Sequence, residues 1–234
     1  MVERKCVLLC GGAGTRMLPL SLTMQKGMIK IGDKPIIRHL VEYWSWFCNE
    51  FIFVVNYRKN EIIEYVPSLG VKYTVVEIDH LRGIADGIYQ VRNLTKGNFV
   101  VVLGDCVCRG DFDNVKFDEM GVGVIRTNRE DDIRKSYSVE ISASDPHRIT
   151  RVVEKPKVLV NDLCGQGYYF FDHRVFSYIE NTPASALRGE IEVTDVIQTM
   201  IEHGEYVRAN MFTGKYINIT FPDDIQEAGS FLPE

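Results

Sequence analysis

Strand-like and helix-like segments alternate through the first half of the chain, and this alternation limits the fold more than any other feature. Short runs rich in apolar and β-branched residues lie at 6–10, 51–55, 71–78 and 99–103. The segments between them have helical character, at 35–48, 60–66 and 81–94. Parallel strands need long crossover connections, which are usually helices. The pattern therefore predicts an α/β fold with a doubly wound, mostly parallel sheet flanked by helices.

The pattern changes after Asp105, where strands follow one another with few helices between them. We expect strands at 121–127, 137–141, 149–153, 167–171, 206–212 and 216–220, and helices near 172–180 and 192–202. This change predicts a mixed sheet. Because the chain contains no repeat and no low-complexity linker, we expect a single domain over 1–234, with one half at about 1–110 and the other at about 111–234.

Composition and charge exclude several classes of protein. The hydrophobic fraction of 45% is typical of globular domains, and no apolar run reaches the ~18 residues that a membrane helix needs. The net charge of −5 argues against a nucleic-acid partner. The first five residues carry charges of both signs and do not resemble a signal peptide. The six cysteines form no C-x-x-C pair and are expected in the core. We predict a cytoplasmic protein with no membrane partner.

A glycine-rich turn follows the first predicted strand, and it is the first candidate for a binding site. The segment reads Gly11-Gly12-Ala13-Gly14-Thr15-Arg16. It matches neither the P-loop pattern nor the dinucleotide pattern, which would need glycine at Met17. A turn without side chains lets backbone N–H groups approach an anion, and Arg16 adds a fixed cation. The segment predicts a phosphate-binding loop, with a plain tight turn as the alternative.

The apolar strand at 99–103 ends in Gly104-Asp105. A carboxylate at the carboxyl end of a parallel strand lies where open α/β sheets bind ligands. Aspartate is also common in ordinary turns, so this position alone leaves both readings open.

Taken in order along the chain, these motifs and four others resemble the signature of the sugar-1-phosphate nucleotidyltransferases, such as the glucose-1-phosphate thymidylyltransferase-like and uridylyltransferase-like enzymes. The others are His80–Gly87, Val153-Glu154-Lys155-Pro156 with the strand that starts at Gly167, Arg188–Asp195, and Tyr216–Asp224. The resemblance covers almost the whole chain. It implies a Rossmann-like fold of the nucleotide-diphospho-sugar transferase type, with a nucleotide-binding half before a sugar-phosphate-binding half.

The resemblance also implies a role for individual residues. Those implied to bind the nucleotide are Leu9, Gly11, Gly12, Gly14, Thr15, Arg16, Lys26, Gly83 and Asp86. Those implied to bind the sugar phosphate are Gly104, Glu154, Lys155, Gly167, Arg188 and Glu190. The implied catalytic residues are Arg16, Lys26, Asp105 and Lys155, and the implied ligands of a Mg2+ cofactor are Asp105 and Asn218.

Two positions depart from the family pattern. Gln25 stands where the family usually has proline before its lysine, and Asn218 stands where it usually has a metal-binding aspartate. An amide oxygen still suits magnesium, which prefers oxygen ligands.

The expected activity is transfer of a nucleotidyl group from an NTP to a sugar 1-phosphate, by in-line attack at the α-phosphorus. Two alternatives stay open. One is a catalytically silent homologue that binds nucleotide or NDP-sugar, and the other is an enzyme acting on a non-sugar phosphorylated alcohol. The nucleobase, the sugar and a homo-oligomeric state are also left open.

Overall fold

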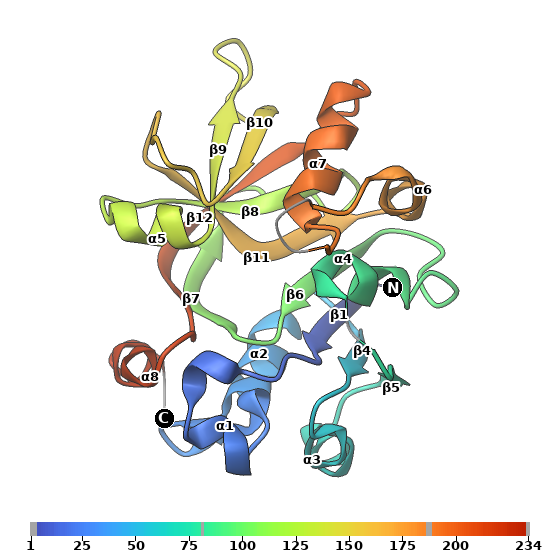
Figure 1. Cartoon of the computed structure of the whole chain (residues 1–234), viewed down its shortest axis with the longest axis vertical. Helices are drawn as coiled ribbons and strands as arrows, with labels where there is room; N and C mark the ends of the chain where they lie inside the picture. Colours follow the sequence, from blue (N-terminus) through green and yellow to red (C-terminus); the bar gives the residue numbers. More distant parts are fainter. Residues whose placement is uncertain (1–3, 81, 186–188, 233–234) are drawn as a thin grey trace. The chain divides into compact units, whose positions relative to one another are not determined.

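The computed structural model describes residues 4–80, 82–185 and 189–232 (Figure 1). The chain divides into two compact units. Unit 1 consists of Met1–Leu81, Val101–Gly110 and Gly214–Glu234, and unit 2 of Arg82–Val100 and Asp111–Thr213. These bounds differ from a single division near residue 110. The segment 82–100 belongs to unit 2, and the segment 214–234 belongs to unit 1.

Three parallel strands form the centre of unit 1: β1 (Lys5–Cys10), β4 (Glu50–Val55) and β5 (Tyr73–Glu77). Strand β4 pairs with β1 on one side and with β5 on the other, and every residue of β4 is buried. A strand buried on both faces has a continuous apolar sequence instead of an alternating one. The blue and teal arrows in Figure 1 follow this arrangement. The parallel strands predicted from the sequence are therefore confirmed in this unit.

The crossover helices of unit 1 are α2 (Ile36–Trp44) and α3 (Lys59–Tyr65). In α2 the apolar side chains at helical spacing are buried: Ile36, Ile37, Leu40, Val41 and Trp44. The helix begins after Pro35, whose fixed φ suits a helix start, and it ends before the predicted residue 48 in a turn at 45–47.

Short elements lie between β1 and α2: η1 (Thr15–Met17), α1 (Leu20–Thr23), η2 (Lys26–Met28) and the hairpin of β2 (Lys30–Ile31) with β3 (Lys34–Pro35). Unit 1 also holds η3 (Val66–Leu69) and the helix α8 (Pro222–Gly229). Three of the four boundaries between the two units fall within strands, in β6 (Phe99–Leu103), β7 (Cys106–Phe112) and β12 (Arg208–Asn218).

Unit 2 contains a mixed set of strands: β8 (Gly121–Arg126), β9 (Tyr137–Ile141), β10 (Ile149–Glu154) and β11 (Leu163–Phe171), with the first part of β12. Strand β11 pairs antiparallel with β8 and β9, β9 pairs antiparallel with β10, and β12 pairs parallel with β8. Its helices are α4 (Gly83–Tyr89), α5 (Glu130–Lys135), α6 (Arg174–Asn181) and α7 (Val193–Glu202). The expected mixed character is confirmed here.

Several element bounds differ from expectation. The helix expected at 81–94 is only α4, because turns follow Tyr89, and Leu81 lies outside the described residues. Strand β7 was not predicted. The two strands expected at 206–212 and 216–220 are one strand, β12, which continues through Gly214. A Cβ at Gly214 would lie 2.3 Å from the carbonyl oxygen of Arg109, so glycine is needed where β12 lies against β7.

All six cysteines are buried, and no disulfide joins any of them. They are core residues, as their apolar surroundings in the sequence indicated. Within residues 4–80, 82–185 and 189–232, none of the helices combines the length and the apolar composition that a membrane crossing needs.

Candidate functional site

The glycine-rich loop begins where β1 ends. Gly14 has φ of 60° and ψ of 37°, the left-handed region that favours glycine, and it leads into η1. A Cβ at Gly12 would have nothing within 4 Å, so this stretch of backbone is uncovered. Among the described residues, no hydrogen bond uses the N–H groups of Gly12, Ala13 or Gly14 as donors. The loop therefore presents free backbone donors, as an anion-binding loop requires.

Arg16 extends from the same loop as an exposed side chain. In the part of the chain that the structure describes, it forms no ion pair. A guanidinium beside unused N–H groups is well suited to bind phosphate oxygens. Leu9, Gly11 and Thr15, which the resemblance also assigned to the nucleotide, lie in or next to this loop.

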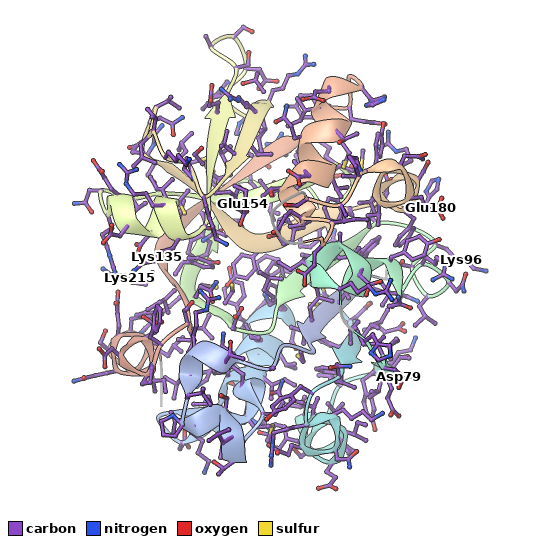
Figure 2. All side chains as sticks on the ribbon, viewed as in Figure 1. Asp79, Lys96, Lys135, Glu154, Glu180 and Lys215 are labelled. Carbon is purple, nitrogen blue, oxygen red and sulfur yellow. The ribbon has the colours of Figure 1, made fainter. Side chains whose placement is uncertain are left out.

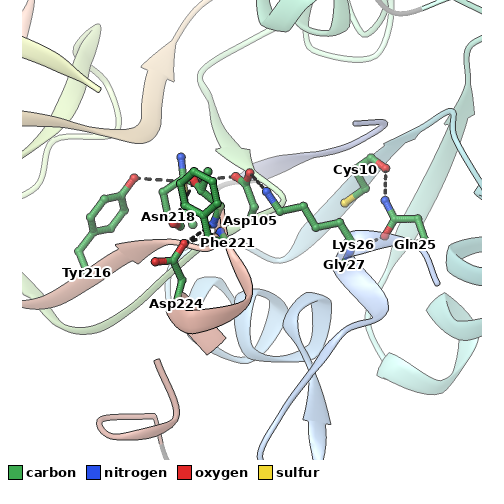
Figure 3. Close-up of polar contacts among 11 residues, drawn as sticks. Cys10, Gln25, Lys26, Gly27, Asp105, Tyr216, Asn218, Phe221 and Asp224 are labelled. Atoms are coloured by element: carbon green, nitrogen blue, oxygen red, sulfur yellow. Dashed lines mark hydrogen bonds and ion pairs between the residues drawn. The ribbon is translucent and has the colours of Figure 1, made fainter. Parts of the chain in front are cut away.

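An ion pair joins two residues that are 79 positions apart in the sequence. The Nζ atom of Lys26 lies 2.5 Å from Oδ2 of Asp105, and the two side chains are only 13% and 25% exposed. Figure 3 shows the Lys26 side chain extended toward this carboxylate. Two of the residues expected to be catalytic therefore contact each other directly.

Gly104 explains how Asp105 reaches this position. Its N–H donates to the carbonyl oxygen of Leu9 at 3.0 Å, and a Cβ on Gly104 would lie 2.6 Å from the same oxygen. Only glycine permits this close approach to the end of β1. The structure thus gives Gly104 a packing role, and its expected contact with the sugar phosphate stays a prediction.

Asn218 lies at the end of β12, beside Asp105. The N–H of the next residue, Ile219, donates to the backbone oxygen of Asp105 at 2.8 Å. The Asn218 side chain is exposed, and its Oδ1 accepts a long hydrogen bond of 3.4 Å from Oγ1 of Thr220. Asp224 fixes the turn that follows, by accepting from the N–H groups of Thr220 and Phe221 at 2.6 and 2.7 Å. Unit 1 therefore brings Lys26, Asp105 and Asn218 together (Figure 3).

The metal ligands expected from the sequence are one carboxylate and one amide. Within the described ranges, no group of three or more histidine, cysteine, aspartate and glutamate side chains is arranged to hold a metal ion. Any ion at Asp105 and Asn218 would need further oxygen ligands from a substrate or from water.

A second group of expected site residues lies in unit 2, at the end of β10. Glu154 is half-buried, and burial raises the pKa of its carboxyl group, with Lys155 opposing the shift and Glu192 adding to it. Oγ1 of Thr194 donates to Oε2 of Glu154 at 3.3 Å. Figure 2 marks Glu154 at the end of its strand. Thr194 lies in the Arg188–Asp195 motif, but no signal in the sequence indicated its bond to Glu154.

Lys155 follows Glu154 with φ of 43°, a left-handed conformation that is uncommon for a residue with a side chain. Its N–H donates to the backbone oxygen of Ser136 at 2.9 Å, which holds the turn in place. The Nζ atom lies 3.5 Å from Oε1 of Glu154, and 43% of the side chain is exposed. The amine is thus close to the Glu154 carboxylate and accessible to an anion. Gly167, on β11 of the same unit, is buried.

Gly83 and Glu190 also contact each other in unit 2. Gly83 has φ of 88°, and a Cβ there would lie 3.2 Å from Cβ of Glu190. Asp86 uses both carboxylate oxygens at the start of α4, where it accepts from the N–H of Arg82 at 3.0 Å and from Nε2 of Gln90 at 3.1 Å. Its expected contact with a nucleotide stays a prediction. Arg188 lies outside the described residues.

Gln25 is a residue whose contacts the sequence did not reveal. It marks a departure from the family pattern, yet its side chain is buried and joins the end of β1 to the turn that carries Lys26. The only signal in the sequence is its position next to Lys26.

Together, the parallel strands of unit 1, the uncovered glycine loop after the first strand and the lysine–aspartate pair are features of an α/β fold that is suited to bind an anionic ligand. Comparison with known sequences makes the class specific. The chain belongs to the nucleotidyl transferase family, whose sequence model matches residues 5–232. The family expected from the motifs is therefore confirmed.

Two relatives with known names resemble this chain over almost its whole length. The bifunctional protein GlmU of Methanocaldococcus jannaschii is 29% identical over 226 residues, which are 97% of this chain and 53% of that protein. The chain thus spans about half the length of the GlmU proteins it matches. The UTP–glucose-1-phosphate uridylyltransferase AglF of Haloferax volcanii is 27% identical over 237 residues, 98% of this chain and 97% of that protein.

Solved structures confirm the fold class. A UDP-glucose pyrophosphorylase complexed with UDP-glucose superimposes with a TM-score of 0.84 at 22% identity, over 98% of both chains. A putative glucose-1-phosphate thymidylyltransferase from Bacillus anthracis gives the same TM-score and identity, over 97% of this chain and 94% of its own. The fold is therefore the Rossmann-like, mixed α/β fold of these proteins.

Proposed function

We propose that this protein transfers a nucleotidyl group from a nucleoside triphosphate to a sugar 1-phosphate and releases pyrophosphate. The observation that carries the proposal is the Lys26–Asp105 pair in the same unit as a glycine loop with unused N–H groups and an exposed Arg16. The relative AglF, which this chain matches almost from end to end, is named for a reaction of this type.

In the proposed reaction, an oxygen of the sugar 1-phosphate attacks the α-phosphorus of the NTP in line with the leaving group. The bond from the α-phosphorus to its bridging oxygen breaks, and pyrophosphate leaves with the electron pair. Such transfers need positioning and charge neutralisation and no protein nucleophile. The glycine loop and Arg16 hold the triphosphate, and Lys26 stabilises the charge that develops on the leaving group.

Lys155 orients the attacking phosphate in this scheme, and Glu154 accepts hydrogen bonds from sugar hydroxyls. The exposed amine of Lys155 and the Glu154 carboxylate held by Thr194 support these roles. Gly104, Gly167, Arg188 and Glu190 complete the proposed acceptor set, while Gly83 and Asp86 are proposed to contact the nucleotide.

Asp105 and Asn218 are the residues proposed to hold Mg2+. Oδ1 of Asp105 contacts Sγ of Cys106 at 3.5 Å, and Oδ1 of Asn218 accepts at 3.4 Å. A thiol is a weak donor and the bond to Asn218 is long, so neither contact occupies its oxygen strongly. Carboxylate and amide oxygens are ligands that suit a hard cation. The ion, when bound, neutralises charge on the phosphate oxygens. We place the protein in the cytoplasm, since buried cysteines without a disulfide suit a reducing compartment.

A pyrophosphate-release assay tests the proposal, with each common NTP crossed with several sugar 1-phosphates and with phosphorylated non-sugar alcohols. We expect release only when an NTP, one acceptor and Mg2+ are all present. Release at the same rate without any acceptor would refute the proposal, because it would indicate hydrolysis. Nucleotide binding without release would favour the silent homologue, although the intact Lys26–Asp105 pair argues against that alternative.

A further inference from the structure

Gln25 is a buried polar residue whose side-chain nitrogen and oxygen both form hydrogen bonds. Its side chain is only 1% exposed. Nε2 donates to the carbonyl oxygen of Cys10 at 2.7 Å, and Oε1 accepts from the N–H of Gly27. An unsatisfied polar group at this depth would be costly, so these two bonds hold the amide in one orientation.

The two bonds connect the two ends of the proposed nucleotide loop. Cys10 is the last residue of β1, directly before the glycines, and Gly27 lies in η2, directly after Lys26. The amide therefore sets the distance between the start of the loop and the turn that carries the Lys26 amine (Figure 3).

Helix α3 and the residue before it also hold the segment that leads to Lys26. The backbone N–H of Gln25 donates to Oε2 of Glu61 at 2.7 Å. Arg58, which is paired with the other oxygen of Glu61, donates to the backbone oxygens of Leu22 and Thr23 at 3.1 and 2.8 Å. The turn before Lys26 is thus held at its side chain and at its backbone.

The backbone of Gln25 has φ of −65° and ψ of 139°, and this φ is the angle that proline imposes by its ring. A proline fixes this geometry covalently and has no N–H to donate. In this chain, hydrogen bonds fix the same geometry, and they add a tie to β1 that a proline ring cannot make.

We propose that Gln25 is a positioning residue that acts through Lys26, by holding its amine against Asp105 at a fixed distance from the glycine loop. The proposal rests on the proposed function, since it takes Lys26 to be a triphosphate ligand. Glutamine suits the role because one side chain both donates to Cys10 and accepts from Gly27. Leucine does neither, and glutamate keeps only the acceptor.

The test is a double-mutant cycle on nucleotide binding, measured by calorimetry with NTP and Mg2+. Gln25→Leu should weaken binding about 10-fold or more in the wild-type background, and less than about 2-fold in a Lys26→Ala background, because its effect passes through Lys26. Equal losses in the two backgrounds would overturn the proposal, because they would indicate a general structural role. If Gln25→Leu fails to fold, the same cycle with Gln25→Glu decides by the same criterion.

Gln198→Leu is the matched control. Gln198, on α7 of unit 2, also joins two segments, by accepting from the N–H of Val152 at 3.0 Å and donating to Glu202 at 2.9 Å. We expect it to leave NTP affinity unchanged, and a loss equal to that of Gln25→Leu would overturn the proposal. The cycle measures NTP binding and does not depend on catalysis. If the protein binds NTP but releases no pyrophosphate, the proposed function is refuted, and the cycle still decides whether Gln25 acts through Lys26.

Discussion

Replacing Lys26 with methionine removes one charge from the Lys26–Asp105 pair and keeps most of the length of the side chain. Removing one partner of a fully buried pair costs about 3–5 kcal/mol. Because 13% and 25% of these two side chains remain exposed, we expect a smaller loss in the free energy of unfolding, about 1–2 kcal/mol. Asp105 stays behind near solvent, so the fold should survive.

The effect on activity should be much larger than the effect on stability. A group that stabilises charge developing on the leaving pyrophosphate contributes ~10²–10³-fold to the rate, or about 2.7–4 kcal/mol. We therefore expect kcat/KM for pyrophosphate release to fall by this factor in Lys26→Met. Urea unfolding of the same preparation measures the stability change.

Lys72→Met provides the matched control, since Nζ of Lys72 lies 2.7 Å from Oε2 of Glu50 in the same unit. It should leave kcat/KM within about 2-fold of wild type, as surface pairs contribute little. If Lys26→Met retained half of the wild-type activity, or if Lys72→Met lost as much, Lys26 would not be a triphosphate ligand.

Three further predictions concern the acceptor and metal residues. Lys155→Ala should lower kcat/KM for the sugar phosphate by ~10²-fold in steady-state kinetics, with little change in NTP affinity measured by calorimetry. Loss of NTP binding with normal acceptor binding would assign Lys155 to the nucleotide instead. In a magnesium titration of activity, Asn218→Asp should need less Mg2+, Asn218→Ala should lose most activity, and Asp105→Ala nearly all of it; wild-type Mg2+ dependence in Asn218→Ala would remove Asn218 from the metal site. The raised pKa of Glu154 means that the folded state keeps this proton when the unfolded state has lost it, so stability falls as pH rises above the ordinary value of 4.5. Glu154→Gln should reduce the change in the urea midpoint of unfolding as pH rises above 4.5, and it should weaken sugar-phosphate binding. If the urea midpoint depended on pH as it does in the wild type, the Glu154 carboxyl group would not be the cause of that dependence.

The parallel strands of unit 1 were predictable because their burial leaves a direct mark on the sequence. Phe51 to Val55 is apolar throughout, as a strand covered on both faces must be. Strand β7 was missed because Arg109, Gly110 and Asp111 interrupt its apolar start, and such residues usually mark a loop. Strand β12 was predicted as two strands because a glycine such as Gly214 usually indicates a break between elements. In the structure, Gly214 instead permits close contact with the backbone of Arg109.

The sequence predicted which residues belong to the candidate site, but it did not predict which of them contact one another. The motifs named Lys26 and Asp105 separately, and no local rule shows that residues so far apart form an ion pair. Asp86 illustrates the opposite limit, because the sequence cannot reveal that its carboxylate is already engaged at a helix start. The sequence showed Gln25 only as a departure from the family pattern, because the partners of a buried amide depend on the fold.

The order in which the chain builds its two units has a consequence during synthesis. Every segment of unit 2 precedes residue 214, whereas unit 1 needs the segment Gly214–Glu234 in addition to its earlier parts. A nascent chain on the ribosome therefore has all the sequence of unit 2 before unit 1 is complete. Asn218 and Asp224 emerge after every residue of unit 2. A chain released at residue 213 would keep Glu154 and Lys155 but lack Asn218, so early termination should yield a product unable to consume nucleotide.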